Sequence, residues 1–418
     1  MARTEDASQI RQNYIWNTLG SLANALASVM LLMVATRCLG AGGAGVFSLA
    51  YALGQQFQIV GAFEMRPYQA TDVRGRYSFS VYLGSRILTT SIMVFAIVAY
   101  GFAMYGIGRD LLILTCVCGL RILDVAEDVF QGALQRVGRL DIAGKALFLR
   151  VVVTTVVFCA GLVATHDIVM SCLFSFVVSL PVLYALNVKR ATAWVKPTPS
   201  FEMADIKSLI FACAPLFAGS FLQSDLTNVP RLAIHNVLST DMQTIYSALF
   251  MPALVINLLS GFLFKPMLTT MAESWEEHEH CGFASIICRC EALVASATVV
   301  CCAGAFVVGI PVLSFLYGID LSGYRPFLIV IMIGGGLNAA NIVMYYALVT
   351  MRRQRVIMGA YVLADLVSRF ISSRIVCTFG MTGAAYAYAL SMLVIFSIYA
   401  VDVLRGISGI TSRHSDEG

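Results

Sequence analysis

The sequence predicts an all-α integral membrane protein, with about twelve transmembrane helices in two six-helix bundles around a central cavity. Composition is the first observation behind this prediction: of 418 residues, 59% are apolar and 12% are charged, and the mean hydropathy is +0.80. Soluble domains are about 45–50% apolar and about 25% charged, so this excess requires lipid as the solvent. The second observation is that long apolar runs recur along the whole chain.

Twelve stretches of the chain are apolar and long enough to cross a membrane, which takes about 20 residues of helix. We place them near 15–36, 44–64, 82–106, 111–134, 143–164, 168–188, 207–235, 242–264, 284–310, 326–350, 356–376 and 382–404. The fourth and seventh are the most polar. The polar N-terminus precedes a long apolar run without a convincing cleavage site, which indicates a first span that is retained.

Basic residues predict the orientation of these spans. Nineteen of the 28 Lys and Arg residues fall at the termini or in connections on one side of the predicted membrane. The other side has only Arg37, Arg109, Arg325 and Arg374, at or near helix ends. Because cytoplasmic connections carry the excess of Lys and Arg, we predict that both termini are cytoplasmic.

A polar connection divides the chain nearly in half. It contains Pro197 and Pro199, which suit an extended linker. We therefore predict an N-terminal six-helix bundle at 1–190, a cytoplasmic linker at 191–206 and a C-terminal six-helix bundle at 207–418. Many transporters consist of two such bundles.

Polar residues recur at spacings of three or four along the first, second, fourth and seventh spans, which places each set on one helix face. The candidate cavity-lining residues are Asn17, Asn24, Gln55, Gln58, Asp124, Asp128, Gln131, Ser224, Asn228 and His235. A charge at the centre of a span costs roughly 2.5–3.5 kcal/mol, so a water-filled cavity or internal pairing is needed to tolerate it. The alternative is that these residues bond neighbouring helices together. We interpret the four faces together as cavity walls, with the eighth span completing them.

Arginines within or beside the spans are candidate ligands for an anionic substrate. Arginine binds phosphate through two parallel hydrogen bonds and keeps its charge. The candidates are Arg66, Arg86, Arg121, Arg150 and Arg231.

Internal ion pairing is the alternative role for such arginines. Asp124 lies three residues after Arg121, and Asp365 lies four residues before Arg369, so both pairs have helical spacing. Arg231 has no acid at such a spacing on its own span. It is therefore the strongest ligand candidate of the set.

No catalytic, metal or cofactor motif stands out. The stretch "GAGGAGVFS" lacks the Lys-Ser/Thr of a phosphate loop and is interpreted as a tight extracellular turn. The stretch "EEHEHC", with His278, His280 and Cys281, fits no standard metal spacing. We therefore expect no enzyme activity, no metal, no cofactor and no nucleic-acid partner.

Four stretches resemble bacterial polysaccharide-biosynthesis membrane proteins, the Wzx-type lipid-linked oligosaccharide flippases of the multidrug/oligosaccharidyl-lipid/polysaccharide exporter superfamily. They are "NYIWNTLGSLANALASVMLLMVATRCLG", "MRPYQATDVRGRYSFSVYLGSRILT", "EDVFQGALQRVGRLDIAGKALFLR" and "NVPRLAIHNVLSTDMQTIYSALFMPALVINLLSGFLFKPML". The resemblance implies a multi-pass protein of the bacterial cytoplasmic membrane. It would turn a polyprenyl-diphosphate-linked oligosaccharide to the outer leaflet by alternating access, with the five arginines as candidate diphosphate ligands. Membrane lipids, a polysaccharide polymerase and glycosyltransferases are the implied partners.

Two other functions compete with this expectation. A drug or cation antiporter of the same superfamily would use deep acids to bind protons or sodium, and Asp124, Asp128 and Asp365 are available. The arginines beside these acids argue against free carboxylates. A membrane polymerase or ligase would need a large periplasmic loop, and the outward connections predicted here are all short.

Overall fold

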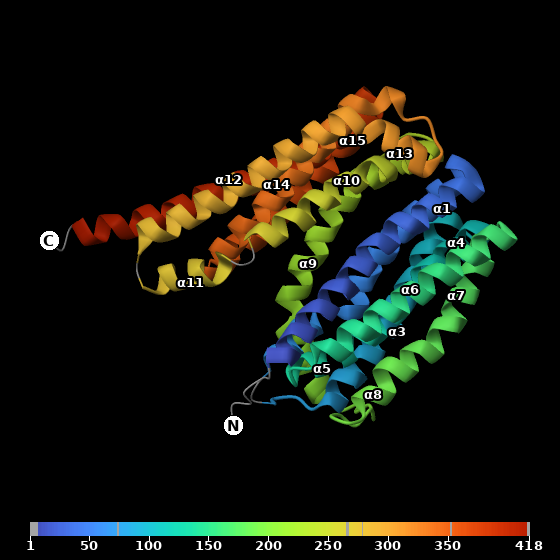
Figure 1. Cartoon of the computed structure of the whole chain (residues 1–418), viewed down its shortest axis with the longest axis horizontal. Coiled ribbons are helices and arrows are strands. Elements are labelled where there is room, and N and C mark those ends of the chain that lie inside the picture. Colours follow the sequence, from blue (N-terminus) through green and yellow to red (C-terminus); the bar gives the residue numbers. More distant parts are fainter. Residues whose placement is uncertain (1–6, 73–74, 265–266, 278, 352, 416–418) are drawn as a thin grey trace. The chain divides into compact units, whose positions relative to one another are not determined.

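The computed structural model describes all residues except 1–6, 73–74, 265–266, 278, 352 and 416–418 (Figure 1). The described residues contain helices and no strand. Internal contacts divide the chain into two compact units, Met1–Phe221 and Leu222–Gly418. The predicted all-α class is confirmed.

The described residues of the N-terminal unit form ten helical elements. They are α1 (Ala7–Ala62), α2 (Met65–Thr71), α3 (Phe79–Tyr105), α4 (Arg109–Gly119), α5 (Arg121–Arg136), α6 (Leu140–Thr165), α7 (Ile168–Leu183), the π-helical η1 (Tyr184–Val188), α8 (Lys189–Ala191) and the first part of α9 (Met203–Val237). The chain turns within α1 at Gly40, whose φ of 71° is readily available only to glycine. This turn lies at the start of "GAGGAGVFS", and α1 supplies the first two predicted spans.

The described residues of the C-terminal unit form the rest of α9 and eight further elements. They are α10 (Thr240–Phe264), α11 (Leu268–Glu276), α12 (His280–Gly304), the π-helical η3 (Ala305–Gly309), α13 (Ile310–Tyr317), the 3₁₀-helical η4 (Ser322–Tyr324), α14 (Arg325–Thr350) and α15 (Gln354–Ser415). As in α1, a glycine with positive φ, Gly380 at 59°, divides α15 into two helices.

Eight described helices are long and apolar enough to cross a membrane. Two of them, Arg11–Ala62 and Arg355–Ile407, contain the turns at Gly40 and Gly380 and supply two spans each. The pair α4–α5 and the helix α10 occupy the remaining predicted spans. Large apolar side chains such as Phe95, which is 75% exposed, point away from the protein, as a lipid-facing surface requires.

Glycines let helices approach closely in both units. In the N-terminal unit, a methyl group added at Gly144 of α6 would lie 2.5 Å from the backbone oxygen of Trp16 in α1. In the C-terminal unit, three consecutive glycines of α14 contact three different helices. Added methyl groups at Gly334, Gly335 and Gly336 would overlap Tyr388 of α15, Ala253 of α10 and Thr298 of α12. Small residues at helix contacts are typical of membrane bundles.

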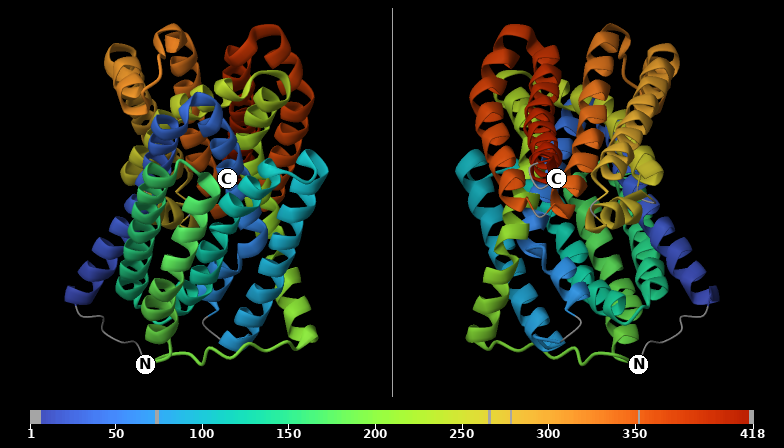
Figure 2. Two further views of the ribbon diagram at one scale, coloured as in Figure 1. Left: turned by 90° about the vertical axis from the view of Figure 1, so that its right-hand side faces the viewer. Right: turned by 90° about the vertical axis from the view of Figure 1, so that its left-hand side faces the viewer.

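The connection between α8 and α9 packs along the N-terminal unit. Ser200 N–H donates to Ser80 O at 2.9 Å, and a methyl group at Gly84 would overlap the Ser200 carbonyl. Figure 2 shows this connection in green along the ends of the N-terminal helices. The start of α9 then joins the core of the same unit, because Ile206, Leu209 and Cys213 are almost fully buried there. The N-terminal unit therefore extends past the predicted linker at 191–206, as far as Phe221.

Candidate substrate and charge sites

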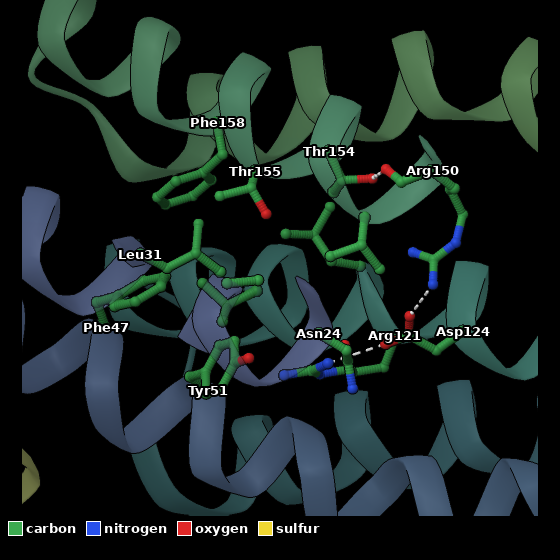
Figure 3. Close-up of a pocket in the computed structure, with 14 residues that line it drawn as sticks. Asn24, Leu31, Phe47, Tyr51, Arg121, Asp124, Arg150, Thr154, Thr155 and Phe158 are labelled. Atoms are coloured by element: carbon green, nitrogen blue, oxygen red, sulfur yellow. Dashed lines mark hydrogen bonds and ion pairs between the residues drawn. The ribbon is translucent and has the colours of Figure 1, made fainter. Parts of the chain in front are cut away.

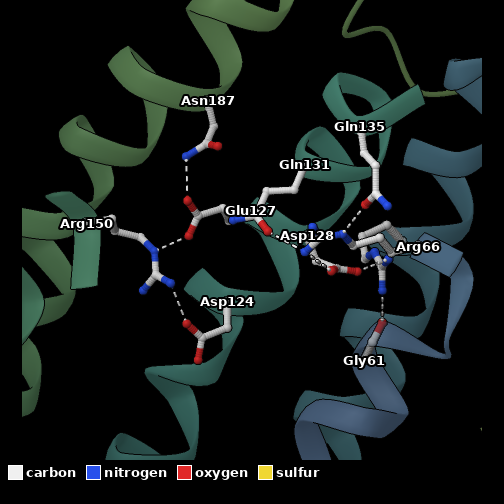
Figure 4. Close-up of polar contacts among 10 residues, drawn as sticks. Gly61, Arg66, Asp124, Glu127, Asp128, Gln131, Gln135, Arg150 and Asn187 are labelled. Atoms are coloured by element: carbon white, nitrogen blue, oxygen red, sulfur yellow. Dashed lines mark hydrogen bonds and ion pairs between the residues drawn. The ribbon is translucent and has the colours of Figure 1, made fainter. Parts of the chain in front are cut away.

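The polar helix α5 forms the centre of a charge network in the N-terminal unit. Its polar residues are Arg121, Asp124, Glu127, Asp128, Gln131 and Gln135. Helical spacing places them on neighbouring faces, and the structure divides them into two groups that contact different helices (Figure 4).

Arg150 of α6 connects the acids of the first group. Its Nη2 donates to Asp124 Oδ1 at 2.6 Å, and its Nε donates to Glu127 Oε2. Arg121 Nη1 donates to the other oxygen of Asp124 at 2.8 Å, so the predicted i,i+3 pair is confirmed. Asn187 Nδ2 donates to the other oxygen of Glu127 at 3.1 Å. All four carboxylate oxygens of Asp124 and Glu127 are therefore bonded.

Asp128 is the acid of the second group. Arg86 of α3 donates to Asp128 Oδ2 at 2.7 Å and to the backbone oxygen of Gly61 at 3.0 Å. Arg66 of α2 lies 3.6 Å from Asp128 Oδ1 and donates to Gln131 at 2.5 Å. Its Nε donates to Gln135 at 3.2 Å.

The network is close to electrically neutral. Four arginines, of which Arg86, Arg121 and Arg150 are buried, face the acids Asp124, Glu127 and Asp128. Glu64 lies near Arg86 and Asp128 and brings a fourth carboxylate. The four arginines of this unit that were predicted from the sequence as anion ligands therefore form ion pairs with acids of the same unit.

The π-helical segment η1 places Asn187 against Glu127. Pro181, inside α7, has no backbone N–H and interrupts the helical hydrogen-bond ladder just before η1. The wider π turn follows, and Asn187 is fully buried within it. Such turns are frequent at functional sites. The sequence offered no signal for Asn187, whereas Glu127 lies three residues after Asp124 and could have been counted with the face.

A cavity lies beside the first group of acids, between α1, α4, α5 and α6 (Figure 3). It has a volume of about 50 Å³, and a buried water needs roughly 10–15 Å³ of such space. One wall is apolar, with Leu31, Phe47 and Phe158, and the other is polar, with Asn24, Tyr51, Arg121, Asp124, Arg150, Thr154 and Thr155. It therefore holds a few water molecules or one small polar group.

Arg121 has one free donor at this cavity. Its guanidinium carbon lies 4.2 Å from the centre of the Tyr51 ring, and its buried Nη2 has no hydrogen-bond partner among the described residues. The aromatic face stabilises the cation. An acceptor atom that enters the cavity would find this donor.

Other predicted cavity residues of the N-terminal unit have different surroundings. Asn24 lines the cavity, whereas Asn17 and Gln55 are exposed and Gln58 is half-buried. Gln56, which is not among the predicted cavity-lining residues, is buried and donates to the Phe221 carbonyl at 3.1 Å. Asn13 of α1 donates to Gly138 O at 3.0 Å and ties α1 to the turn before α6. Of the rejected metal motif, His278 lies outside the described residues.

Arg231 belongs to the C-terminal unit and has an unusual environment. It is buried on α9, and its guanidinium lies over the rings of Tyr246 at 5.8 Å and Phe250 at 5.6 Å. None of the ion pairs between described residues includes Arg231, and its Nε has no hydrogen-bond partner among them. Asp225, on the same helix, pairs with Arg369 instead.

The other three predicted residues of α9 surround this position along the same helix. Asn228 is buried, and Ser224 and His235 are half-buried. The five arginine candidates are thus divided, four in the N-terminal unit and one in the C-terminal unit.

No protein-family profile matches the chain, and no curated protein matches it. Solved structures do. A multidrug resistance MATE family transporter of the MOP superfamily, in an inward-facing conformation, matches with a TM-score of 0.61 at 14% identity, over 95% of this chain and 96% of its own. The chain has the MATE transporter fold. A variant of the Vibrio cholerae MATE transporter VcmN matches with a TM-score of 0.62 at 9% identity, over 96% and 98%.

A third solved structure has a similar fold. A MOP superfamily transporter from Pyrococcus furiosus matches with a TM-score of 0.57 at 18% identity, over 97% of this chain and 96% of its own. The predicted layout of twelve helices in two bundles is that of the MATE fold and is confirmed. At these identities the likeness concerns the fold alone.

Proposed function

We propose that the chain is an alternating-access membrane transporter that exchanges an organic substrate for a cation. The observation that carries this proposal is the MATE fold over at least 95% of the chain, since the solved proteins that share it are transporters. A fold of two bundles suits alternating access, a mechanism in which transporters of this kind move one bundle against the other. This antiporter function was the alternative to flippase activity in the expectations drawn from the sequence.

The charge network of the N-terminal unit argues against binding of a diphosphate by its four arginines. Four arginine candidates face carboxylates, so little positive charge is left to attract an anion. Acids within a membrane bundle are the usual carriers of protons and metal cations.

Transport by vesicles tests this proposal. Everted membrane vesicles that contain the protein should accumulate a fluorescent cationic dye when a proton or sodium gradient is imposed, because cation release drives dye movement. Vesicles without the protein, and vesicles treated with an ionophore that collapses the gradient, are the controls. Equal dye accumulation with and without the protein would contradict exchange of this class of substrate.

Transfer of a polyprenyl-diphosphate-linked oligosaccharide is the second candidate, and the environment of Arg231 favours it. Arg231 is a buried cation outside the described ion pairs, with Nε unbonded, as a diphosphate ligand requires. The sequence resemblance to Wzx-type flippases points to the same substrate, with a polymerase and glycosyltransferases as partners.

Replacement of Arg231 tests the second candidate. In a strain that depends on this gene for surface polysaccharide, Arg231→Ala should abolish export while the protein stays in the membrane. Arg231→Lys should restore part of the export, since lysine keeps the charge but not the paired hydrogen bonds. Normal surface polysaccharide in the Ala variant would remove Arg231 from the substrate site.

A further inference from the structure

Two acids share one arginine in the C-terminal unit. Arg369 of α15 donates through Nε to Asp365 Oδ2 at 2.9 Å, one turn earlier on the same helix. Its Nη2 donates to Asp225 Oδ2 on α9. The side chains of Asp225 and Asp365 are 8% and 10% exposed, whereas that of Arg369 is 51% exposed. With both acids ionised, the group carries one excess negative charge.

No further ion pair between described residues involves Asp225, Asp365 or Arg369. The largest electrostatic influences on Asp225 come from Asp365 and Arg369, and those on Arg369 come from the same two acids. The helix α14 packs along α15 and brings one charged residue, Arg325, at its first position. The helix α10 brings Asp241 in its first turn, and Arg231 of α9 lies over the aromatic rings of α10.

One oxygen of this group lacks a partner. Asp365 is 7% exposed, and its buried Oδ1 has no hydrogen-bond partner among the described residues. A buried acceptor without a donor costs roughly 1–3 kcal/mol, and more when it is charged. A proton on one carboxyl removes the excess charge and supplies an O–H donor between two acids that already contact the same guanidinium.

We infer that Asp225 and Asp365 form a proton-binding site that takes up one proton between them. The proton arrives from water, an O–H bond forms at one carboxyl oxygen, and the net charge of the group with Arg369 changes from −1 to zero. The remaining carboxylate keeps Arg369. Because Asp225 is on α9 and Asp365 is on α15, proton uptake changes the attraction between these two helices. Membrane acids arranged in this way serve proton relays in pumps and transporters.

The binding of the proton stands on this geometry alone, whereas its use as the exchanged cation rests on the proposed antiport. Binding is measured first, by infrared difference spectroscopy of the purified full-length protein titrated with acid. On acidification, the spectrum of wild type minus that of Asp225→Asn or Asp365→Asn should show a carbonyl band of a protonated carboxyl, because the bands of the other acids of the chain cancel in the difference. In each variant the remaining acid forms a one-to-one pair with Arg369 and stays ionised.

Three further variants make the titration decisive. Arg369→Gln should raise the midpoint of the band by about 1–3 pH units, because the opposite charge is lost. Asp365→Glu should keep a band and shows that loss in the Asn variants does not reflect misfolding. Asp402→Asn removes an acid of the same helix that pairs singly with Arg353, and should leave the band unchanged. A band that persists in both Asn variants would overturn the inference.

A second measurement separates this inference from the proposed function. If sodium chloride, but not choline chloride, abolishes the band at constant pH, sodium competes with the proton for the two acids, and a site that takes only a proton is refuted. Proteoliposomes with an internal pH indicator then show whether a gradient of the cationic dye drives protons across the membrane through the protein. A normal infrared band without such flux would refute proton exchange as the transport function and leave the proton-binding site in place.

Discussion

At the scale of single residues, the membrane arginines act first on acids of the same bundle. Arg150 contacts two carboxylates, and Arg86 and Arg121 contact one each. Removal of one member of a buried pair leaves an uncompensated charge, whereas an exposed pair contributes little. The two kinds of pair occur in the same unit and can be compared directly.

Arg150→Ala should destabilise the protein by about 3–5 kcal/mol, since among the described residues Glu127 would keep only its hydrogen bond from Asn187. Thermal unfolding in detergent, followed by circular dichroism, measures the change. The matched control is Arg109→Ala, because Arg109 is 70% exposed in its pair with Asp167 and should change stability by about 0–1 kcal/mol. Equal losses in the two variants would mean that burial does not set the strength of these pairs.

Asp72, in the connection between α2 and α3, gives a prediction for pH. Partial burial opposes its ionisation, but hydrogen bonds from the N–H groups of Arg76 and Tyr77 outweigh burial and hold the pKa of Asp72 below its usual range. A lowered folded-state pKa adds stability above the unfolded pKa of about 4, which is lost as the pH falls through the folded value. Asp72→Asn should therefore loosen this connection to protease at neutral pH, and the difference from wild type should shrink in acid. A pH-independent difference would contradict this.

The same residues show how far sequence reasoning reaches. Arg121–Asp124 and Arg369–Asp365 were predicted because both partners lie on one helix, where spacing alone brings them together. Arg150–Glu127, Arg86–Asp128 and Arg369–Asp225 each join two helices. Their formation depends on helix rotation and depth, which a single sequence does not specify. The transport roles predicted for these residues stay predictions.

At the scale of elements, glycines decide how the helices of the C-terminal unit meet. Gly335 of α14 faces Ala253 of α10. A methyl group added at Gly335 would lie 3.1 Å from the backbone Cα and O atoms of Ala253, and backbone atoms have little freedom to move. The sequence predicted both helices as spans, but not which residue of one faces the other. The sequence alone does not show which neighbouring helix each of the three glycines faces.

Gly335→Ala should lower stability by about 1–3 kcal/mol, because an extra methyl group overpacks the contact of α14 with α10. Gly359→Ala is the matched control in α15, where an added methyl group has nothing within 4 Å. There the change should stabilise by roughly 0.4–1 kcal/mol, since alanine loses less chain freedom on folding. Melting midpoints in detergent would decide, and a stable Gly335→Ala protein would show that the helices can move apart freely.

At the scale of the whole molecule, the number of spans was predictable because each apolar run must cover the membrane thickness. The turns at Gly40 and Gly380 explain why twelve spans correspond to fewer continuous helices. Orientation depends on the distribution of Lys and Arg rather than on the fold, and it stays a prediction.

Reporter fusions test the predicted orientation with both termini in the cytoplasm. Alkaline phosphatase, which is active only outside the cytoplasm, should be inactive when fused after Lys196 or at the C-terminus. It should be active when fused after His166, between α6 and α7. The reverse pattern of activity would mean that the protein has the opposite orientation in the membrane, and it would contradict the prediction from the basic residues.

The start of α9 has a consequence for how such proteins can be recombined. The segment at 191–206 looks like the natural place to exchange halves between relatives, yet Ile206, Leu209 and Cys213 beyond it are buried in the N-terminal core. A chimera joined in that segment would bring a foreign helix into a core shaped for another sequence. A junction near Phe221 would keep each hydrophobic core with its own sequence. The N-terminal segment that can be exchanged as a unit is therefore longer than the N-terminal half predicted from the sequence.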